Sequence, residues 1–197
     1  MASLHIASIQ FENASGNKIA NLATIRRLTK QASINGCNVA AFHECSISGY
    51  TFASKLSRQE LWDVAEDIPT GPSIQALIKI AQDTKMVVLA GLFERDECKD
   101  TIYNTYVCVS GDGILAKFRK LHPFISKHLS AGDELVVFDL LGWKAGILIC
   151  YDNNVIENVR ATALIGAEIL FAPHVTMCTP STRPGAGFVD AGLWRNR

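Results

Sequence analysis

The chain has 197 residues, of which 48% are hydrophobic and 19% are charged, and its formal net charge is zero. This composition is typical of one globular domain with a good core. The balanced charge, without a cluster of Lys and Arg, argues against nucleic acid as a partner. No apolar run approaches the roughly eighteen residues of a membrane-spanning helix, so we expect no membrane partner either.

The cysteines and the N-terminal sequence indicate the compartment. The first residues show no charged segment followed by an apolar one, so no secretory signal is visible. The six cysteines contain no CxxC pair and lack the spacing of a disulfide framework. We therefore expect reduced thiols, most of them small core residues, in a cytoplasmic protein.

The first half of the chain alternates strands and helices. Residues 4–10 predict a strand, and apolar residues at helical spacing predict a helix over 17–34, with Gly36 just past its end. A short apolar run at 38–42 predicts a strand covered on both faces. A loop is expected over 46–57. Pro72 is expected to begin a second helix, and residues 86–93 predict another buried strand.

The second half adds hairpins. Strands over 103–109 and 114–119 are expected to join across the turn at 110–113, and a second pair over 135–140 and 144–149 to join around Gly142. A capping box, Asn154 with Glu157, predicts the start of a helix that ends at Gly166. The last predicted strand covers 168–172 and is stopped by Pro173.

This order of elements predicts an α/β fold with a mixed sheet. We treat residues 1–197 as one domain. The stretch from Asp190 to Arg197 neither caps nor completes a predicted element, so we expect the sequence to stop inside that domain.

Three chemistry-bearing residues stand at the ends of predicted strands. Cys150 follows an apolar strand and precedes helix-start sequence, and a helix N-terminus there would favour the reactive thiolate. Glu44 follows the strand at 38–42, and Lys120 follows the strand at 114–119. Functional groups gather at the carboxyl ends of strands in open α/β sheets. We expect parallel neighbouring strands to bring Cys150 and Glu44 to one edge and the hairpin to deliver Lys120.

These residue types suit covalent catalysis on an amide or nitrile carbon. Cys150 would attack the carbon after Glu44 has removed its proton. The Lys120 ammonium and the backbone N–H of Tyr151 would stabilise the resulting negative charge. A water activated by Glu44 would then hydrolyse the thioester.

Each of these residues also has a purely structural interpretation. Cys150 would be an ordinary buried thiol, Glu44 would cap a helix, and Lys120 would be the solvated end of the basic stretch 117–120. The run His43-Glu44-Cys45 suggests a metal cluster, but neighbouring strand residues face opposite ways and no partner pair is visible. We therefore expect no metal.

Three motifs in this order resemble those of the nitrilase superfamily, the carbon–nitrogen hydrolases. They are Phe42-His43-Glu44, Phe118-Arg119-Lys120-Leu121-His122 and Gly146-Ile147-Leu148-Ile149-Cys150-Tyr151-Asp152. The resemblance runs from Leu4 to about Pro173. It implies an αββα sandwich and a triad of Cys150 as nucleophile, Glu44 as base and Lys120 as the oxyanion-stabilising group. It also implies no cofactor and a homodimer or larger homo-oligomer.

The resemblance narrows the expected substrate. Cys150-Tyr151-Asp152 is more similar to the motif of amidases and carbamoyl-amide hydrolases than to that of true nitrilases. The implied reaction is hydrolysis of a small linear amide or N-carbamoyl compound, which releases ammonia or an amine. Tyr50, Tyr151 and His174 are expected to line the substrate pocket.

One departure from the family keeps other hypotheses open. Many members place a second glutamate between the lysine and the cysteine, whereas residues 122–130 contain no acid, and Asp133 and Glu134 come only after Gly132. Together with the early stop, this favours a second hypothesis, a truncated or degenerate member that acts as a non-catalytic binding or assembly module. A weaker third hypothesis is a redox-sensing thiol protein.

Overall fold

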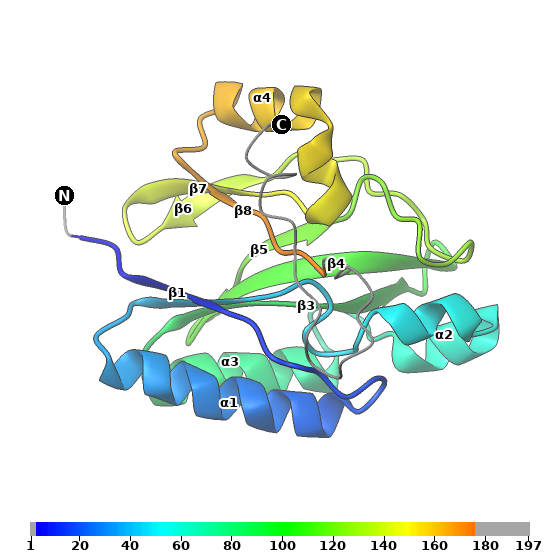
Figure 1. Ribbon diagram of the computed structural model, residues 1–197, viewed down its shortest axis with the longest axis horizontal. Coiled ribbons are helices and arrows are strands. Elements are labelled where there is room, and N and C mark those ends of the chain that lie inside the picture. Colours follow the sequence, from blue (N-terminus) through cyan, green and yellow to red (C-terminus); the bar gives the residue numbers. More distant parts are fainter. Residues whose placement is uncertain (1–2, 176–197) are drawn as a thin grey trace, which may run out of the picture.

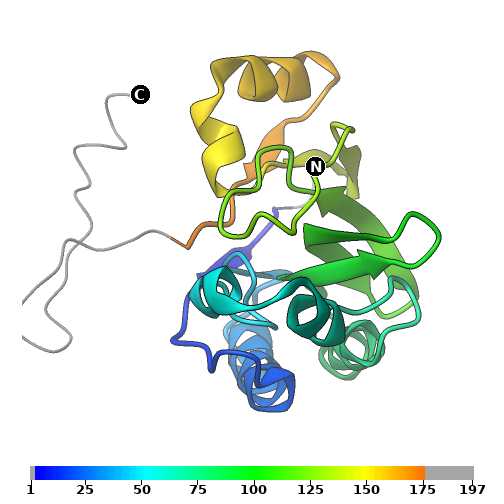
Figure 2. The same cartoon turned by 90° about the vertical axis from the view of Figure 1, so that its right-hand side faces the viewer.

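The computed structural model describes residues 3–175, which form four layers (Figures 1 and 2). Two β-sheets stack face to face. Helices α1 (Lys18–Ile34) and α3 (Pro72–Thr84) cover the outer face of one sheet, and α4 (Ile156–Leu164) covers the outer face of the other. The predicted αββα sandwich is confirmed.

The larger sheet has five strands in chain order. They are β1 (Ile6–Ile9), β2 (Val39–Phe42), β3 (Val87–Asp96), β4 (Thr101–Ser110) and β5 (Gly113–Arg119). Strands β1, β2 and β3 are parallel, and β3, β4 and β5 pair antiparallel. The hairpin predicted across residues 110–113 therefore joins β4 to β5.

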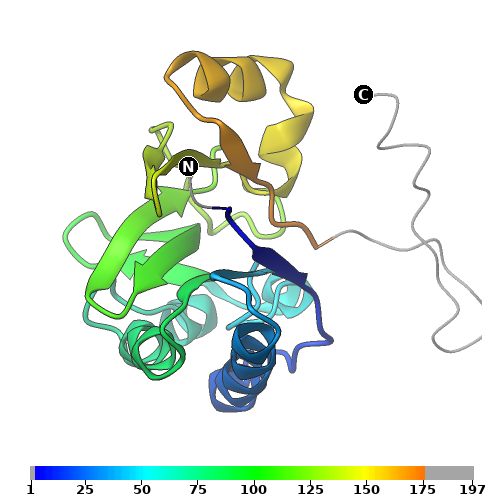
Figure 3. The same cartoon turned by 90° about the vertical axis from the view of Figure 1, so that its left-hand side faces the viewer.

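The smaller sheet has three strands, β6 (Val137–Leu140), β7 (Trp143–Ile147) and β8 (Ile169–Phe171). Strands β6 and β7 form the second predicted hairpin, and α4 is the crossover between the parallel strands β7 and β8. Figure 3 shows that β1 and β8, the edge strands of the two sheets, lie on the same side of the molecule.

Strand β4 shows why the central strands are apolar on both faces. Val107 and Val109 pack toward the helices with the core of α1 and α3, whereas Tyr106 and Cys108 pack against the smaller sheet. Successive strand residues face opposite ways, so a strand between two layers has no solvated face. The five described cysteines are free thiols, as expected, and Cys178 lies outside the described residues. Every helix between residues 3 and 175 is too short or too polar to cross a membrane.

The stretch from 46 to 71 is more helical than predicted. The expected loop over 46–57 contains a short 3-10 helix, η1 (Thr51–Lys55), and α2 (Arg58–Val64) follows it without having been predicted. The Ser57 side chain caps α2, and the Glu60 carboxylate accepts a hydrogen bond from the Ser57 N–H at 2.8 Å. This Ser-x-x-Glu capping box is a signal that the sequence contains.

The capping box predicted at Asn154 and Glu157 is wrong. Asn154 ends a 3-10 turn, η2 (Cys150–Asn154), and α4 begins at Ile156 without a side-chain cap. The polar side chains of this stretch stabilise the turn instead. Asn153 donates to the Leu148 carbonyl at 2.7 Å. The expectation about residues 190–197, by contrast, lies outside the described residues.

Candidate active site

A fully buried ion pair forms the centre of the site. The Nζ of Lys120 lies 2.6 Å from Oε1 of Glu44, and both side chains are 0% exposed. The same oxygen accepts a hydrogen bond from Nδ2 of Asn104 at 2.8 Å, and Oε2 accepts from the Val175 N–H at 3.1 Å. The carboxylate is therefore held on both oxygens, which gives its charge a defined position.

The backbone around Glu44 is fixed by a close approach to β3. The Ile47 N–H donates to the Gly91 carbonyl at 2.9 Å, and the Gly91 N–H donates to the hydroxyl of Ser46 at 3.2 Å. A Cβ at Gly91 would lie 2.4 Å from the backbone nitrogen of Cys45. Glycine is therefore required at position 91 so that the turn carrying Glu44 can lie against the strand.

Cys150 is held at the start of η2 in a left-handed conformation, with φ +50°. Its N–H donates to the Pro173 carbonyl at 2.9 Å. Its thiol is partly buried, and Glu44, Lys120 and the Val175 backbone all lie near enough to influence its pKa. The structure therefore brings Cys150, Glu44 and Lys120 together.

The strands that carry these residues are arranged differently from the prediction. Glu44 and Lys120 follow β2 and β5 of the five-stranded sheet, whereas Cys150 follows β7 of the three-stranded sheet. Strands β2 and β7 are not neighbours in one sheet, so the expectation of a shared edge is wrong. The site forms where the ends of two stacked sheets face each other.

The thiol of Cys150 is not predisposed to ionise. Burial raises its pKa to about 11, helped by the negative charge of Glu44 and opposed by Lys120 and the Val175 backbone. The expected thiolate-favouring helix start is wrong, because a five-residue 3-10 turn begins at Cys150 and burial raises the pKa of its thiol. The resting group is a thiol beside a carboxylate, an arrangement that needs proton transfer before attack.

Aromatic rings extend from the buried pair to the surface. Lys120 Nζ lies 5.2 Å from the ring centroid of Phe124 and 5.6 Å from that of Tyr50. The ring of Phe124 packs edge-on against Tyr50 and Tyr151, with centroids 6.5 and 6.2 Å apart. We call Tyr50, Phe124 and Tyr151 the aromatic wall. Tyr50 is buried, and the other two are exposed.

The hydroxyl of Tyr50 is a buried group without a hydrogen-bond partner among residues 3–175. Burial raises the pKa of this phenol, and the nearby Glu44, Cys45 and Cys150 add to the effect. The hydroxyl is therefore neutral and able to donate. A buried polar group left unpaired is destabilising, so this hydroxyl has a donor available for a further partner.

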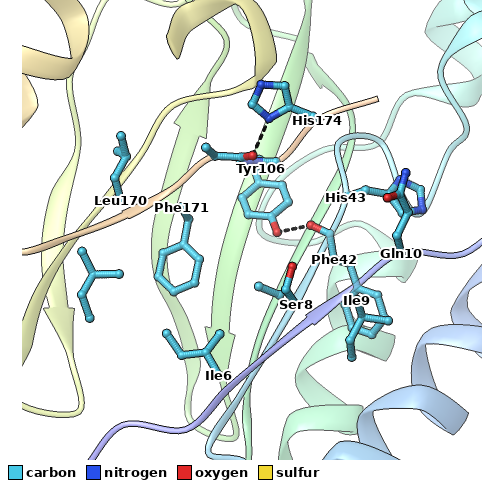
Figure 4. A pocket seen from close by; sticks show the side chains of 14 residues that line it. Ile6, Ser8, Ile9, Gln10, Phe42, His43, Tyr106, Leu170, Phe171 and His174 are labelled. Atoms are coloured by element: carbon cyan, nitrogen blue, oxygen red, sulfur yellow. Dashed lines mark hydrogen bonds between the residues drawn. The ribbon is translucent and has the colours of Figure 1, made fainter. Parts of the chain in front are cut away.

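The third predicted pocket residue, His174, lines a different hollow. A groove of about 410 Å³ lies between β1 and β8 (Figure 4), and its lining includes His43 and His174 but none of Glu44, Lys120 and Cys150. The Nδ1 of His174 donates to the Ala172 carbonyl at 2.6 Å. Contact between His174 and a substrate stays a prediction.

The first acids after the lysine lie in a separate depression. Asp133 and Glu134 line a depression together with Lys99, Lys117 and Arg119, and that lining includes none of the triad. His43 is also occupied otherwise, because its Nδ1 donates to the Glu44 carbonyl at 3.0 Å and burial lowers its pKa. Within the described chain, no group of three His, Cys, Asp or Glu side chains is placed to hold a metal ion.

Two contributors to the site were missed from the sequence. Asn104 lies inside β4, a stretch predicted only as one strand of a hairpin, and an amide side chain within such a run was the available signal. Phe124 lies in the acid-free segment 122–130, where no motif marks an aromatic residue as part of the site. Neither Asn104 nor Phe124 lies at a sequence distance from Cys150 that would indicate a shared site.

Comparison with known proteins agrees with this geometry. The carbon–nitrogen hydrolase family matches residues 5–186. A nitrilase of Pyrococcus abyssi is 34% identical over 156 residues, which cover 78% of this chain and 58% of the relative. The omega-amidase NIT2 of Bos taurus is 33% identical over 186 residues, covering 88% and 64%.

The fold has solved counterparts as well. Nit3 of Saccharomyces cerevisiae, described as a member of branch 10 of the nitrilase superfamily, superimposes with a TM-score of 0.77 at 26% identity. That match covers 88% of this chain and 65% of the yeast chain. The chain spans about three-fifths of the length of the curated relatives that it matches. It belongs to the carbon–nitrogen hydrolase family, within the nitrilase superfamily.

Proposed function

We propose that the protein hydrolyses the C–N bond of a small linear amide or N-carbamoyl compound through a thioester on Cys150. The observation that carries this proposal is the buried Glu44–Lys120 pair beside the Cys150 thiol. A buried ion pair contributes little to stability by itself, whereas a fixed base and a fixed cation beside a nucleophile are what acyl transfer requires.

In the first half of the reaction, Glu44 accepts the proton of the Cys150 thiol while the sulfur attacks the carbonyl carbon. A C–S bond forms, and the carbonyl π electrons move to the oxygen. The Lys120 ammonium and the Tyr151 N–H stabilise that oxyanion. The oxyanion then collapses, the C–N bond breaks, and the nitrogen takes the proton from Glu44. Ammonia or an amine leaves, and the thioester remains.

In the second half, Glu44 removes a proton from water as the water oxygen attacks the thioester carbon. The C–S bond breaks, and the sulfur recovers the proton from Glu44. The raised pKa of the Cys150 thiol agrees with this cycle, because the resting enzyme then keeps the proton on sulfur until Glu44 takes it. The protein ends each cycle in the protonation state in which it began.

The aromatic wall suits the acyl group of the substrate. Tyr50 presents a neutral, unpartnered hydroxyl close to Cys150, and we assign it a hydrogen bond to the bound amide. Tyr151 and Phe124 offer exposed rings against which a short apolar chain packs. We keep His174 as a further proposed contact. An amide is favoured over a nitrile by the Cys150-Tyr151-Asp152 sequence, although one relative is named a nitrilase.

A second candidate function is a non-catalytic binding or assembly module. It is favoured by the lack of acid at residues 122–130 and by the placement of Asp133 and Glu134 in a separate depression. Redox sensing is less favoured, because sensor thiols are stabilised as thiolates and the pKa of Cys150 is raised. We further propose a homodimer or larger homo-oligomer, which light scattering on the purified protein tests.

The catalytic proposal is tested with a panel of short linear amides, N-carbamoyl amines and nitriles, with ammonia release as the signal. We expect turnover by the wild type, none by Cys150→Ala, and near-normal turnover by Cys37→Ala, a cysteine packed against the helical core. Ammonia release that continues in Cys150→Ala excludes the thioester mechanism. A wild type that is inactive on every amide in the panel favours the binding-module hypothesis.

A further inference from the structure

Asp152 carries a buried carboxylate that the proposed reaction does not use. It lies two residues after Cys150 and is 0% exposed. Its Oδ1 accepts from the His122 N–H at 2.8 Å and lies 3.0 Å from Nδ1 of the same histidine. Its Oδ2 accepts from the N–H groups of Leu121 and Ile149, at 3.2 and 3.3 Å.

These partners belong to the backbone on either side of the site. Leu121 and His122 come directly after Lys120, and Ile149 comes directly before Cys150. Because Lys120 follows β5 and Cys150 follows β7, the Asp152 carboxylate joins segments from two different sheets. The backbone carbonyl of Asp152 also accepts from Nδ2 of Asn158 in α4, at 3.1 Å.

We propose that Asp152 is a positioning residue that fixes the Lys120 backbone relative to Cys150. An anionic oxygen holds backbone N–H donors more firmly than a neutral one, and three such donors converge on this carboxylate. Each would be buried or half-buried without a partner if the carboxylate were lost. Since β5 and β7 share no strand pairing, the carboxylate links the two segments where the sheet ladders do not.

A purely structural role is the competing explanation, and Glu66 provides a matched control for it. Glu66 is also buried, accepts from the N–H and hydroxyl of Ser73 at 2.7 Å each, and pairs with Lys18 at 2.7 Å. This network ties α1 to α3, and its side-chain partners, Lys18 and Ser73, lie outside the triad. Neutralising Glu66 therefore removes a comparable buried carboxylate without disturbing the Lys120–Cys150 geometry.

The experiment compares Asp152→Asn with Glu66→Gln in the 197-residue chain. The first readout is the rate at which iodoacetamide alkylates Cys150 in the folded protein, measured by peptide mass spectrometry and normalised to the denatured protein. Asp152→Asn is expected to accelerate this alkylation about tenfold, because a released turn exposes the thiol and removes the burial that suppresses ionisation. Glu66→Gln is expected to leave the rate unchanged.

The second readout is turnover, and here the argument rests on the proposed function. Asp152→Asn is expected to lower kcat about a hundredfold with KM changed less than about threefold, since misplacement of the oxyanion-stabilising group by about 1 Å has that effect. Loss of stability would also expose Cys150 and slow turnover, so the result supports positioning only when Glu66→Gln, destabilised to a similar extent, shows neither change. If the wild type hydrolyses no amide, the alkylation readout still decides the positioning role.

Two further variants complete the test. His122→Ala removes only the side-chain partner of Asp152 and is expected to change the alkylation rate by less than about threefold, because the backbone donors remain. If Asp152→Asn does not accumulate as folded protein, Asp152→Glu is measured instead. It keeps the charge but shifts the oxygens by one methylene, so faster alkylation is again expected. Wild-type alkylation in a folded Asp152 variant overturns the proposal.

Discussion

The ammonium of Lys120 and the carboxylate of Glu44 lie 2.6 Å apart with no solvent exposure, although the two residues are 76 positions apart in the chain. Each neutralises a charge that the protein interior would otherwise leave unpaired. The pair also places a base and a cation beside the Cys150 thiol. Stability and the proposed chemistry therefore depend on the same contact.

The stability of this pair depends on both partners being charged. Lys120→Met leaves the Glu44 carboxylate buried and unpaired, so we expect a loss of about 3 kcal/mol in the free energy of unfolding. The double variant Glu44→Gln/Lys120→Met is expected to lose less than Lys120→Met alone, because no unpaired charge remains. Urea denaturation measures both.

The exposed pair of Lys144 with Asp139 is the control for this cycle. Lys144→Met removes a solvated ion pair and is expected to lower the free energy of unfolding by less than about 1 kcal/mol. A double variant that loses more stability than Lys120→Met alone would contradict the coupling.

The pH dependence of Cys150 alkylation follows from its raised pKa. With a pKa of about 11, the thiolate fraction in the folded protein rises tenfold per pH unit from pH 7 to pH 10. We expect the iodoacetamide rate to rise in the same way without a plateau. A plateau below pH 9 contradicts the burial of this thiol.

The influence of Glu44 on the pKa of Cys150 predicts a second result for the alkylation experiment. The carboxylate raises the pKa of Cys150, so Glu44→Gln lowers it and is expected to speed alkylation at pH 7 while abolishing turnover. Folding favours the protonated thiol. Its contribution to stability is therefore complete below the ordinary pKa of 9.0 and is lost as the pH rises through about 11.

Gly91 is expected to tolerate no side chain. In Gly91→Ala the new Cβ would lie 2.4 Å from the Cys45 nitrogen, a rigid backbone atom, so the turn carrying Glu44 must move. We expect a loss of stability and a fall in kcat of about a hundredfold. At Gly111 the nearest atom is the flexible Gln82 Cγ at 3.1 Å, so Gly111→Ala is the control. Equal activity of the two variants would count against the close approach.

Substitution of Tyr50 is expected to affect activity without lowering stability. Tyr50→Phe removes a hydroxyl that has no partner among the described residues, so the free energy of unfolding is expected to stay unchanged or to rise. If the hydroxyl binds the substrate, kcat/KM falls about tenfold. Tyr106 donates to the Phe42 carbonyl, so Tyr106→Phe is expected to lose about 1 kcal/mol of stability. A destabilised but fully active Tyr50→Phe would refute the assignment.

The sequence motifs pointed to Glu44, Lys120 and Cys150 because each of these residues follows a predicted strand. The prediction could not determine that these strands belong to two sheets, since strand pairing between distant segments leaves no local mark. The pKa of Cys150 was misjudged for a related reason. It depends on burial and on Glu44, whereas the sequence shows only the turn that follows.

The local sequence signals for helix starts were correct in one case and wrong in another. Pro72 marked the start of α3 correctly, because a proline at the first helical position loses no hydrogen bond. Asn154 and Glu157 had the pattern of a capping box, but the turn after Cys150 delayed the helix to Ile156. Asp152 was visible in its motif, yet its link to Leu121 and His122 exists only after the two sheets have stacked.

The central claim is that Cys150 carries the acyl group between the two halves of the reaction. Acid quenching during turnover of an amide with an isotopically heavy acyl group, followed by peptide mapping, tests it most directly. We expect the heavy acyl mass on the peptide containing Cys150, and in Cys150→Ala we expect both this mass and ammonia release to be lost. Steady ammonia release with no acyl mass on Cys150 at any quench time, and undiminished release by Cys150→Ala, would contradict it.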